Sequence, residues 1–278
     1  MREMARQTMP MGLQPFTGIT RTLVIANVAV FFLLALLEAF TRGPAALLEG
    51  FVLLQPAAVA HGFLWQLVTY CFVHFGIFEI AFSMLTLWIC GGMLEAAYGT
   101  RWTRDLYFAS AIGGGIVACV LSYSHVLNLN PGNIGHGSWA ALFGVLIAIG
   151  MRMGDMEFLF FFIIPLKARI MVAIYILIAV AMLLKDRDTF NAVLQLSGAL
   201  AGYLYVRFAP RRGVAGSMTE QYLGVRNWYY RMKRRRAAKK FEVYMGKQGR
   251  QVKFDQEGRY IDPDDPRRRD PNDKRWMN

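Results

Sequence analysis

A serine and a histidine lie two residues apart in the segment GHGSWAALFG, residues 135–144. A serine hydroxyl becomes a useful nucleophile only when a neighbouring base removes its proton, and histidine is the usual base. His136 and Ser138 do not form such a pair by themselves, because residues two apart on a helix do not face each other. A base for Ser138 must therefore come from elsewhere in the chain.

The basic side chains that could serve Ser138 are few. The chain contains four histidines, His61, His74, His125 and His136, and none follows residue 136. The last apolar segment therefore offers no imidazole. A lysine base is also disfavoured, because Lys167 lies in a loop and Lys185 at the end of an apolar segment. We expect no group beside Ser138 that can remove its proton.

Long apolar segments must position these residues. Hydrophobic residues make up 55% of the 278, against roughly 45–50% in an average soluble domain. A bilayer core requires about 20 apolar residues per helix, and a shorter run can span when its flanks help. We therefore expect an all-α, polytopic membrane protein with six transmembrane helices. The six segments are Leu23–Phe40, Phe72–Leu94, Leu106–Ser124, Trp139–Met151, Ile170–Leu184 and Val193–Phe208.

One further apolar run, Phe158–Ile164, is too short to cross and is expected to lie at the interface or against the bundle. The basic residues set the orientation, since Lys and Arg prefer the cytoplasmic side. The loop 125–136 has neither, whereas the N-terminal segment 1–20 and the tail 209–278 do. We expect both termini in the cytoplasm and a multi-pass protein of the bacterial cytoplasmic membrane, although Arg42, Lys185 and Arg187 fit this rule less well.

We expect the tail 209–278 to be a separate, basic and partly disordered region. It carries 19 Lys and Arg and 9 Asp and Glu, a net charge of +10 out of +12 for the whole chain. Basic clusters next to a membrane attract anionic lipid, and interleaved aromatic rings favour the headgroup level. Nucleic acid is the less favoured partner of the same side chains. The candidate lipid-binding residues are Arg231, Lys233, Arg234, Arg235, Arg236, Lys239 and Lys240.

Small residues predict where two of the spans touch. Gly137, Ala141 and Gly144 lie on one helical face of the fourth span, and Gly198 and Gly202 form a small-xxx-small pair in the sixth. Such stripes let helices approach closely in a membrane. We expect the fourth and sixth spans to pack together.

Several separated motifs resemble the rhomboid family of intramembrane serine proteases, over residues 21–208. They are WQLVT from Trp65, FVH from Phe72, EAAYG from Glu95, GSWAALFG from Gly137, PLKAR from Pro165 and QLSGALAG from Gln195. The resemblance implies a six-helix bundle, a serine nucleophile on the fourth span and a histidine base on the sixth. It also implies a histidine and an asparagine on the second span that hold the oxyanion.

At these positions the sequence departs from the family. The nucleophile position is Trp139, the base position is Gln195, and the oxyanion positions are Glu79 and Ser83. Loss of one member of a serine protease's catalytic unit costs on the order of 10⁶ in turnover. The resemblance therefore implies a pseudoprotease that binds transmembrane or membrane-protein clients without cutting them. The alternative is an active endopeptidase that uses Ser138 with an unorthodox base.

Trp139 also has two structural interpretations. It shares a helical face with Phe143, so that both could form a plug with Gln195, whose amide can accept the indole N–H. Alternatively, Trp139 faces lipid at the headgroup level. Glu79 could serve a carrier or channel, but no second charge lies at its depth. The three cysteines have no ligand-like spacing, and we expect no metal and no cofactor.

Overall fold

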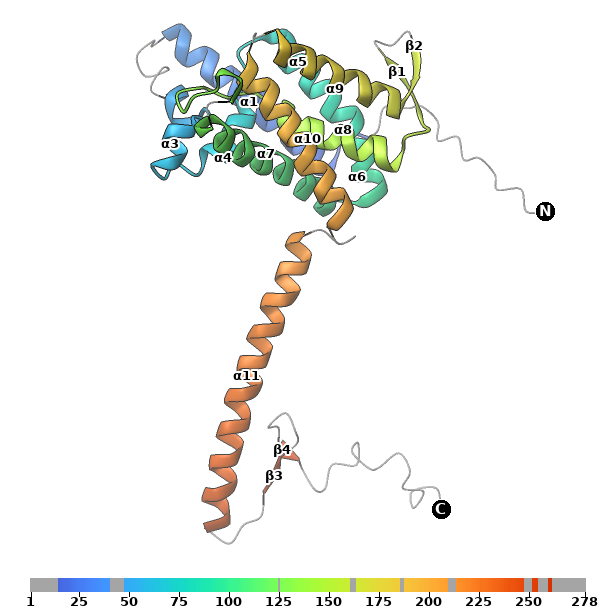
Figure 1. The fold of residues 1–278 in the computed structure, drawn as a ribbon. Helices are drawn as coiled ribbons and strands as arrows, with labels where there is room; N and C mark the ends of the chain where they lie inside the picture. The colour runs from blue at the N-terminus through green and yellow to red at the C-terminus, as the bar shows by residue number, and fades with distance from the viewer. Residues whose placement is uncertain are drawn as a thin grey trace, which may run out of the picture. The chain divides into compact units, whose positions relative to one another are not determined.

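The computed structural model of the chain describes residues 15–40, 48–124, 126–160, 164–185, 188–209, 214–247, 252–254 and 260–261 (Figure 1). The chain divides into two compact units, Met1–Ala215 and Gly216–Asn278. Parts of the expected terminal segments, residues 1–14 and 262–278, lie outside the described residues, as does His125.

The first unit is a bundle of helices. Its elements are α1 (Gly18–Phe40), α3 (Pro56–Ala60), α4 (Gln66–Thr69), η1 (Tyr70–Phe72), α5 (Ile77–Thr86), η2 (Leu87–Gly91), α6 (Gly92–Tyr98), α7 (Thr100–Tyr123), η3 (Val126–Asn128), α8 (Trp139–Arg152), α9 (Ala168–Leu184) and α10 (Thr189–Phe208). Helices α5 and α6 form one continuous apolar rod, because η2 is a π-helical turn between them.

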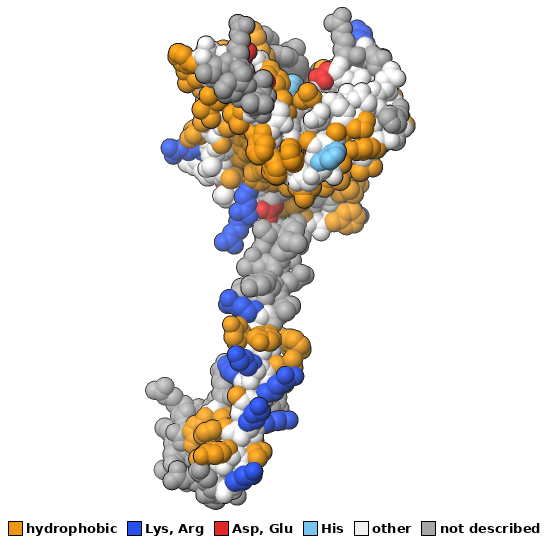
Figure 2. Space-filling view, turned by 90° about the vertical axis from the view of Figure 1, so that its left-hand side faces the viewer, with side chains coloured by type: hydrophobic (Ala, Val, Ile, Leu, Met, Phe, Trp, Pro, Cys, Tyr) orange, Lys and Arg blue, Asp and Glu red, His pale blue; other side chains and the backbone are white. Residues whose placement is uncertain are grey.

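Three helices among the described residues are long and apolar enough to cross a membrane: Gly18–Phe40, Ile77–Tyr98 and Thr100–Tyr123. Helices α8 and α9 are apolar but shorter. At 1.5 Å per residue, the 14 residues of α8 extend about 21 Å, less than the ~30 Å of a hydrocarbon core. Figure 2 shows apolar side chains over much of the visible face of this bundle.

The centre of the bundle is formed by α7, α8 and α10, which pack directly on one another (Figure 1). A side chain on Gly198 would collide with the backbone carbonyl of Ala140, and one on Gly202 would collide with the Cα of Gly144. A Cβ on Gly114 would lie 2.9 Å from the Cα of Gly198. These close approaches require small residues, as expected where helices associate by packing alone.

A carboxylate joins the first helix to the end of the second span. The Glu95 oxygens accept hydrogen bonds from the backbone N–H of Ile19 at 2.8 Å and of Thr20 at 3.0 Å. They also accept the hydroxyls of Thr20 at 2.8 Å and Thr100 at 2.6 Å. Glu95 thus caps the unsatisfied N–H groups at the start of α1, where a negative charge is favourable.

Two small hairpins depart from the expectation of an all-α protein. Strands β1 (Glu157–Phe160) and β2 (Ile164–Lys167) pair antiparallel in the run that we expected at the interface. Residues 161–163 between them lie outside the described residues. This run is too short to form a membrane-spanning helix. Strand pairing provides hydrogen-bond partners for backbone N–H and C=O groups that would otherwise be unpaired.

The second unit contains the long helix α11 (Val214–Lys247) and the strands β3 (Lys253–Phe254) and β4 (Tyr260–Ile261). The strands pair antiparallel, with Phe254 opposite Tyr260. The ring of Phe254 lies 6.2 Å from those of Phe241 on α11 and Tyr260. The tail therefore contains ordered elements in addition to its basic charge.

Candidate functional site

A glycine turn brings the start of α8 against the chain that precedes α5. Gly137 has a φ of +82°, a conformation that favours glycine. Its N–H donates to the carbonyls of Tyr70 at 3.1 Å and Val73 at 2.9 Å. A Cβ at this position would lie 2.6 Å from Oε1 of Glu79. Gly137 thus fixes the position of the next residue, Ser138.

Ser138 lies beside a histidine that is 64 positions away in the sequence. Its Oγ is 3.2 Å from His74 Nε2, and its backbone N–H donates to the same nitrogen at 3.3 Å. Both residues are buried: Ser138 is 0% exposed and His74 is 3% exposed. The expectation that no basic group reaches Ser138 is therefore wrong.

The physical reason for this error is tertiary. A base was expected only on the last span or in the same helix as Ser138. His74 instead precedes α5 and meets Ser138 through the turn at Gly137. His74 belongs to FVH, one of the motifs that resemble the rhomboid family. Sequence spacing alone does not indicate that this histidine contacts residue 138. The signal available in the sequence was a histidine at the start of a long apolar run, where polar side chains are costly and usually have a role.

The hydrogen bonds define the protonation of His74. A backbone N–H can only donate, so Nε2 must accept and the proton must reside on Nδ1. Nδ1 is 3.4 Å from the carbonyl of Phe72. Burial lowers the pKa of His74 below its ordinary value, while the charge of Glu79 acts in the opposite direction. His74 is thus a neutral imidazole whose lone pair two donors of Ser138 share.

Glu79 and Ser83, the residues expected at the oxyanion positions, lie one turn apart on α5, and both make local hydrogen bonds. Glu79 Oε2 accepts the backbone N–H of Phe75 at 3.3 Å. Ser83 is buried, and its hydroxyl donates to the carbonyl of Glu79 at 2.6 Å. A carboxylate only accepts hydrogen bonds when ionised, so it would repel a developing oxyanion instead of stabilising it.

Trp139, the residue expected at the nucleophile position, is half-buried. Trp139 is the first residue of α8, and its ring centroid lies 6.4 Å from that of Phe143 and 6.0 Å from that of Tyr175 on α9. Gln195 lies on α10 and is also half-buried. No hydrogen bond joins these two described side chains, so the expected bond from the indole N–H to the Gln195 amide is not formed. Tyr175 is the third member of the aromatic cluster, because the indole lies against α9.

His136 belongs to the same region but does not reach Ser138. Its ring lies 4.7 Å from that of Phe75, and its backbone N–H donates to Oδ1 of Asn191 at 3.2 Å. Its buried Nδ1 has no hydrogen-bond partner among the described residues. Within this part of the chain, no group of three or more potential ligands could hold a metal ion.

The remaining candidate residues separate into two places. Ala141, Gly144, Gly198 and Gly202 lie at the contact between α8 and α10, and Gly137 lies in the turn before it. The seven basic residues of the tail are all exposed on α11, where Figure 2 shows a series of Lys and Arg side chains. The structure therefore brings Ser138, His74, Gly137 and Glu79 together, and it shows no hydrogen bond between Gln195 and Trp139.

Comparison with known proteins agrees with the resemblance. A family model described as the Rhomboid domain matches residues 61–212, more than half of the chain. The chain is similar to "Rhomboid protease GluP" of Bacillus subtilis (strain 168), with 31% identity over 103 residues. This match covers 37% of the chain and 20% of that relative's length.

Proposed function

The chain belongs to the rhomboid family, and we propose that it is a non-cleaving member that binds transmembrane segments of other proteins. The observation that carries this proposal is the state of Ser138. Its hydroxyl is 0% exposed, so a peptide bond cannot approach it without a rearrangement of the α8 N-terminus. Trp139 and Gln195 replace the two groups that the family's reaction requires.

The pair of His74 and Ser138 supports a structural role. The imidazole lone pair binds the backbone N–H and the hydroxyl of the same residue, which caps the start of α8. Removal of a proton from the hydroxyl would require this lone pair to leave the backbone N–H. Glu79 and Ser83 add no donor for the oxyanion, because their side chains accept from or donate to local backbone.

Client binding would take place on lipid-facing surfaces of the bundle. The approach to α5 and its outer face present the exposed apolar side chains of Phe75, Ile77, Phe78 and Phe82. Helices in a membrane associate by close packing and by occasional polar contacts. A transmembrane client could therefore pack on this face, with the half-buried Glu79 as a polar contact.

We further propose that the chain crosses the membrane six times, through α1, the rod of α5 and α6 from Ile77, α7, α8, α9 and α10, with both termini in the cytoplasm of a bacterial cell. The distribution of Lys and Arg supports this orientation. The shorter helix α8 would cross in a protein environment, since it packs against α7, α9 and α10. Its backbone polar groups would then be shielded from lipid by neighbouring helices.

A second candidate function is supported by one distance. Ser138 Oγ lies 3.2 Å from the unprotonated Nε2 of His74, which is within the reach that a nucleophile and its base require. If Trp139 moved away, this pair could act as a serine-type dyad. The candidate is therefore an endopeptidase that uses Ser138 and His74.

The two candidates differ in a cleavage assay with the full-length protein in proteoliposomes. We expect no cleavage of a helical transmembrane peptide above the level of empty liposomes and no labelling by a fluorophosphonate. Ser138→Ala should leave peptide binding, measured by energy transfer, unchanged. Ser122→Ala is the matched control, since this serine is also 0% exposed. Cleavage that disappears in both Ser138→Ala and His74→Gln would overturn the non-cleaving proposal.

A second experiment introduces the residues that the family carries at the four expected catalytic positions. We expect Trp139→Ser with Gln195→His to cleave poorly or not at all, because Glu79 and Ser83 still offer no oxyanion donors. Adding Glu79→His and Ser83→Asn should raise the rate by about 10²–10³, the usual contribution of one oxyanion donor. Equal cleavage by the double and quadruple variants would show that these two positions do not limit the reaction.

A further inference from the structure

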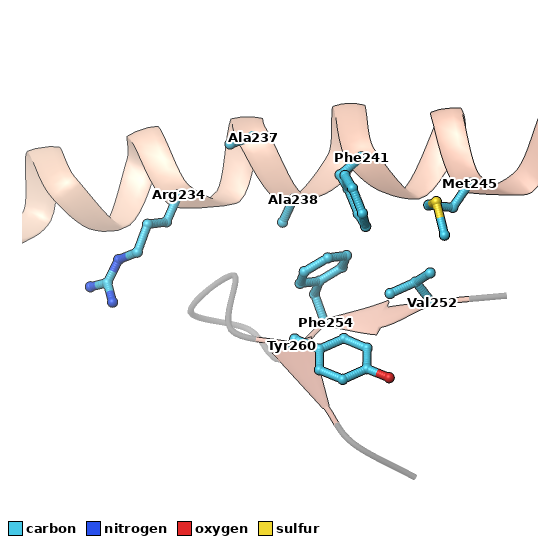
Figure 3. Close-up of a pocket in the computed structure, with 8 residues that line it drawn as sticks. All are labelled: Arg234, Ala237, Ala238, Phe241, Met245, Val252, Phe254 and Tyr260. Carbon is cyan, nitrogen blue, oxygen red and sulfur yellow. The ribbon is translucent and has the colours of Figure 1, made fainter. Parts of the chain in front are cut away.

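The second unit contains an apolar groove between α11 and the hairpin of β3 and β4 (Figure 3). Its volume is about 590 Å³, within the ~300–1,000 Å³ typical of small-ligand sites. Figure 3 shows Phe241 and Met245 extending from the helix toward Val252 and Phe254 of the hairpin. The volume and the mostly apolar lining are therefore suited to a hydrocarbon chain.

The helix residues of the groove follow one face. Arg234, Ala238, Phe241 and Met245 are separated by four, three and four residues, so their side chains lie in line along α11. Ala238 is 8% exposed, and its small side chain leaves room for the hairpin. The apolar members lie toward the C-terminal end of this face, and a positive charge lies at the other end.

Arg234 gives the groove its polarity. Its exposed guanidinium lies on the side of α11 that faces the hairpin (Figure 3). Arginine binds phosphate oxygens with two parallel hydrogen bonds. Five more basic residues, Arg231, Lys233, Arg235, Arg236 and Lys239, lie within five positions of it. A positive rim beside an apolar groove is complementary to an anionic amphiphile.

We propose that this groove binds one acyl chain of an anionic phospholipid from the bilayer, with the phosphate on Arg234. The unit is covalently attached to the membrane bundle through α11, and this attachment raises the concentration of bilayer lipid available to it. Charge alone would attract a headgroup to any part of α11. The groove adds a defined seat for the chain.

The test uses the full-length protein in nanodiscs that contain phosphatidylglycerol with a photoactivatable diazirine on one acyl chain. After irradiation, mass spectrometry should locate crosslinks on the groove peptides around Phe241 and Phe254. The same probe on phosphatidylcholine should label them about fivefold less, the factor that corresponds to about 1 kcal/mol for one charge. Crosslinks confined to the bundle helices would overturn the proposal.

Two arginine variants distinguish a defined lipid-binding site from nonspecific electrostatic attraction of the lipid to α11. Arg234→Gln should lower labelling of the groove about fivefold. Arg231 lies outside the groove, so the fold decrease in labelling for Arg231→Gln should be less than half as large. Equal losses of labelling in the two variants would contradict a defined binding site.

Two further experiments test other occupants of the groove. Protection of the groove by added RNA would identify nucleic acid as the occupant and overturn the proposal. A variant that ends at Ile261 should be labelled as strongly as the wild type. Stronger labelling of this variant would show that the chain's own C-terminus occupies the groove, and this result would also overturn the proposal. None of these outcomes depends on whether the bundle cleaves peptides.

Discussion

At the scale of single residues, protonation of His74 would disturb the site most directly. Its Nε2 accepts two hydrogen bonds from Ser138. A proton on that nitrogen would make the contact with the backbone N–H repulsive and would force the hydroxyl to accept instead of donate. Burial keeps the pKa of His74 below its ordinary value, which is about 6.5 in an unfolded chain. The unfolded state therefore binds the proton more readily than the folded state.

Because the pKa of His74 is lower in the folded than in the unfolded state, we predict that acid destabilises the protein through this residue. The stabilisation is complete above about pH 6.5 and is lost as the pH falls toward the folded-state pKa. Thermal unfolding of the full-length protein in detergent micelles should show a lower midpoint at pH 5 than at pH 7.5. His74→Gln should be less stable at pH 7.5 by about 1 kcal/mol and should lose part of this pH dependence.

His61→Gln is the control for this prediction, because His61 is exposed and its titration should contribute little. If wild type and His74→Gln showed the same dependence on pH, the proton-free Nε2 would have no role in holding α8. A larger loss in His61→Gln than in His74→Gln would likewise contradict the assignment.

At the scale of elements, the crossing of α8 and α10 depends on glycine. A side chain at Gly198 would meet the backbone of Ala140, which cannot move as a flexible side chain can. Forcing extra volume into a packed interior usually costs about 1–3 kcal/mol. We predict that Gly198→Leu lowers the unfolding midpoint in micelles or prevents accumulation of the protein.

Gly50→Ala is the matched control for the crossing, because nothing lies within 4 Å of the position where its Cβ would be. It should accumulate and unfold like the wild type. A stable Gly198→Leu variant with an unchanged midpoint would mean that α8 and α10 are farther apart in the membrane than in this structure.

Hydrophobic patterning predicted the helices better than the contacts between them. The expected segment Leu23–Phe40 lies within α1, and Leu106–Ser124 largely coincides with α7, because long apolar runs have few alternatives to helix. The run from Phe158 was ambiguous, since a short apolar segment reads equally as strand or buried helix. Only the pairing of β1 with β2 resolves it.

The residue types of the candidate site can be read from the sequence, but the contacts between them cannot. Residue types at positions 139 and 195 are visible in the sequence, and so are the small residues of α8 and α10. The contact of Ser138 with His74 depends on a left-handed turn at Gly137 and on hydrogen bonds to Tyr70 and Val73. Such a contact between distant segments has no periodicity that a single sequence could reveal.

At the scale of the whole molecule, the number of crossings decides where the tail acts. Helices α8, α9 and α10 follow the loop that contains Ile134, and none of them appears among the three helices that meet both length and composition criteria. If all three cross, Ile134 and the tail lie on opposite sides of the membrane. If one of them does not cross, they lie on the same side, and the basic tail would then face the surface opposite to the proposed one.

We predict opposite sides, and single cysteines can test this. Ile134 is 53% exposed and Lys240 is exposed, while the native Cys71, Cys90 and Cys119 are buried, so the wild-type protein supplies a low background. In intact bacterial spheroplasts, a membrane-impermeant maleimide should label Ile134→Cys. It should label Lys240→Cys only after lysis, because a cytoplasmic tail is protected by the bilayer. Labelling of both variants before lysis would exclude three crossings between these positions, and labelling of Lys240→Cys alone would reverse the orientation that the basic residues predict.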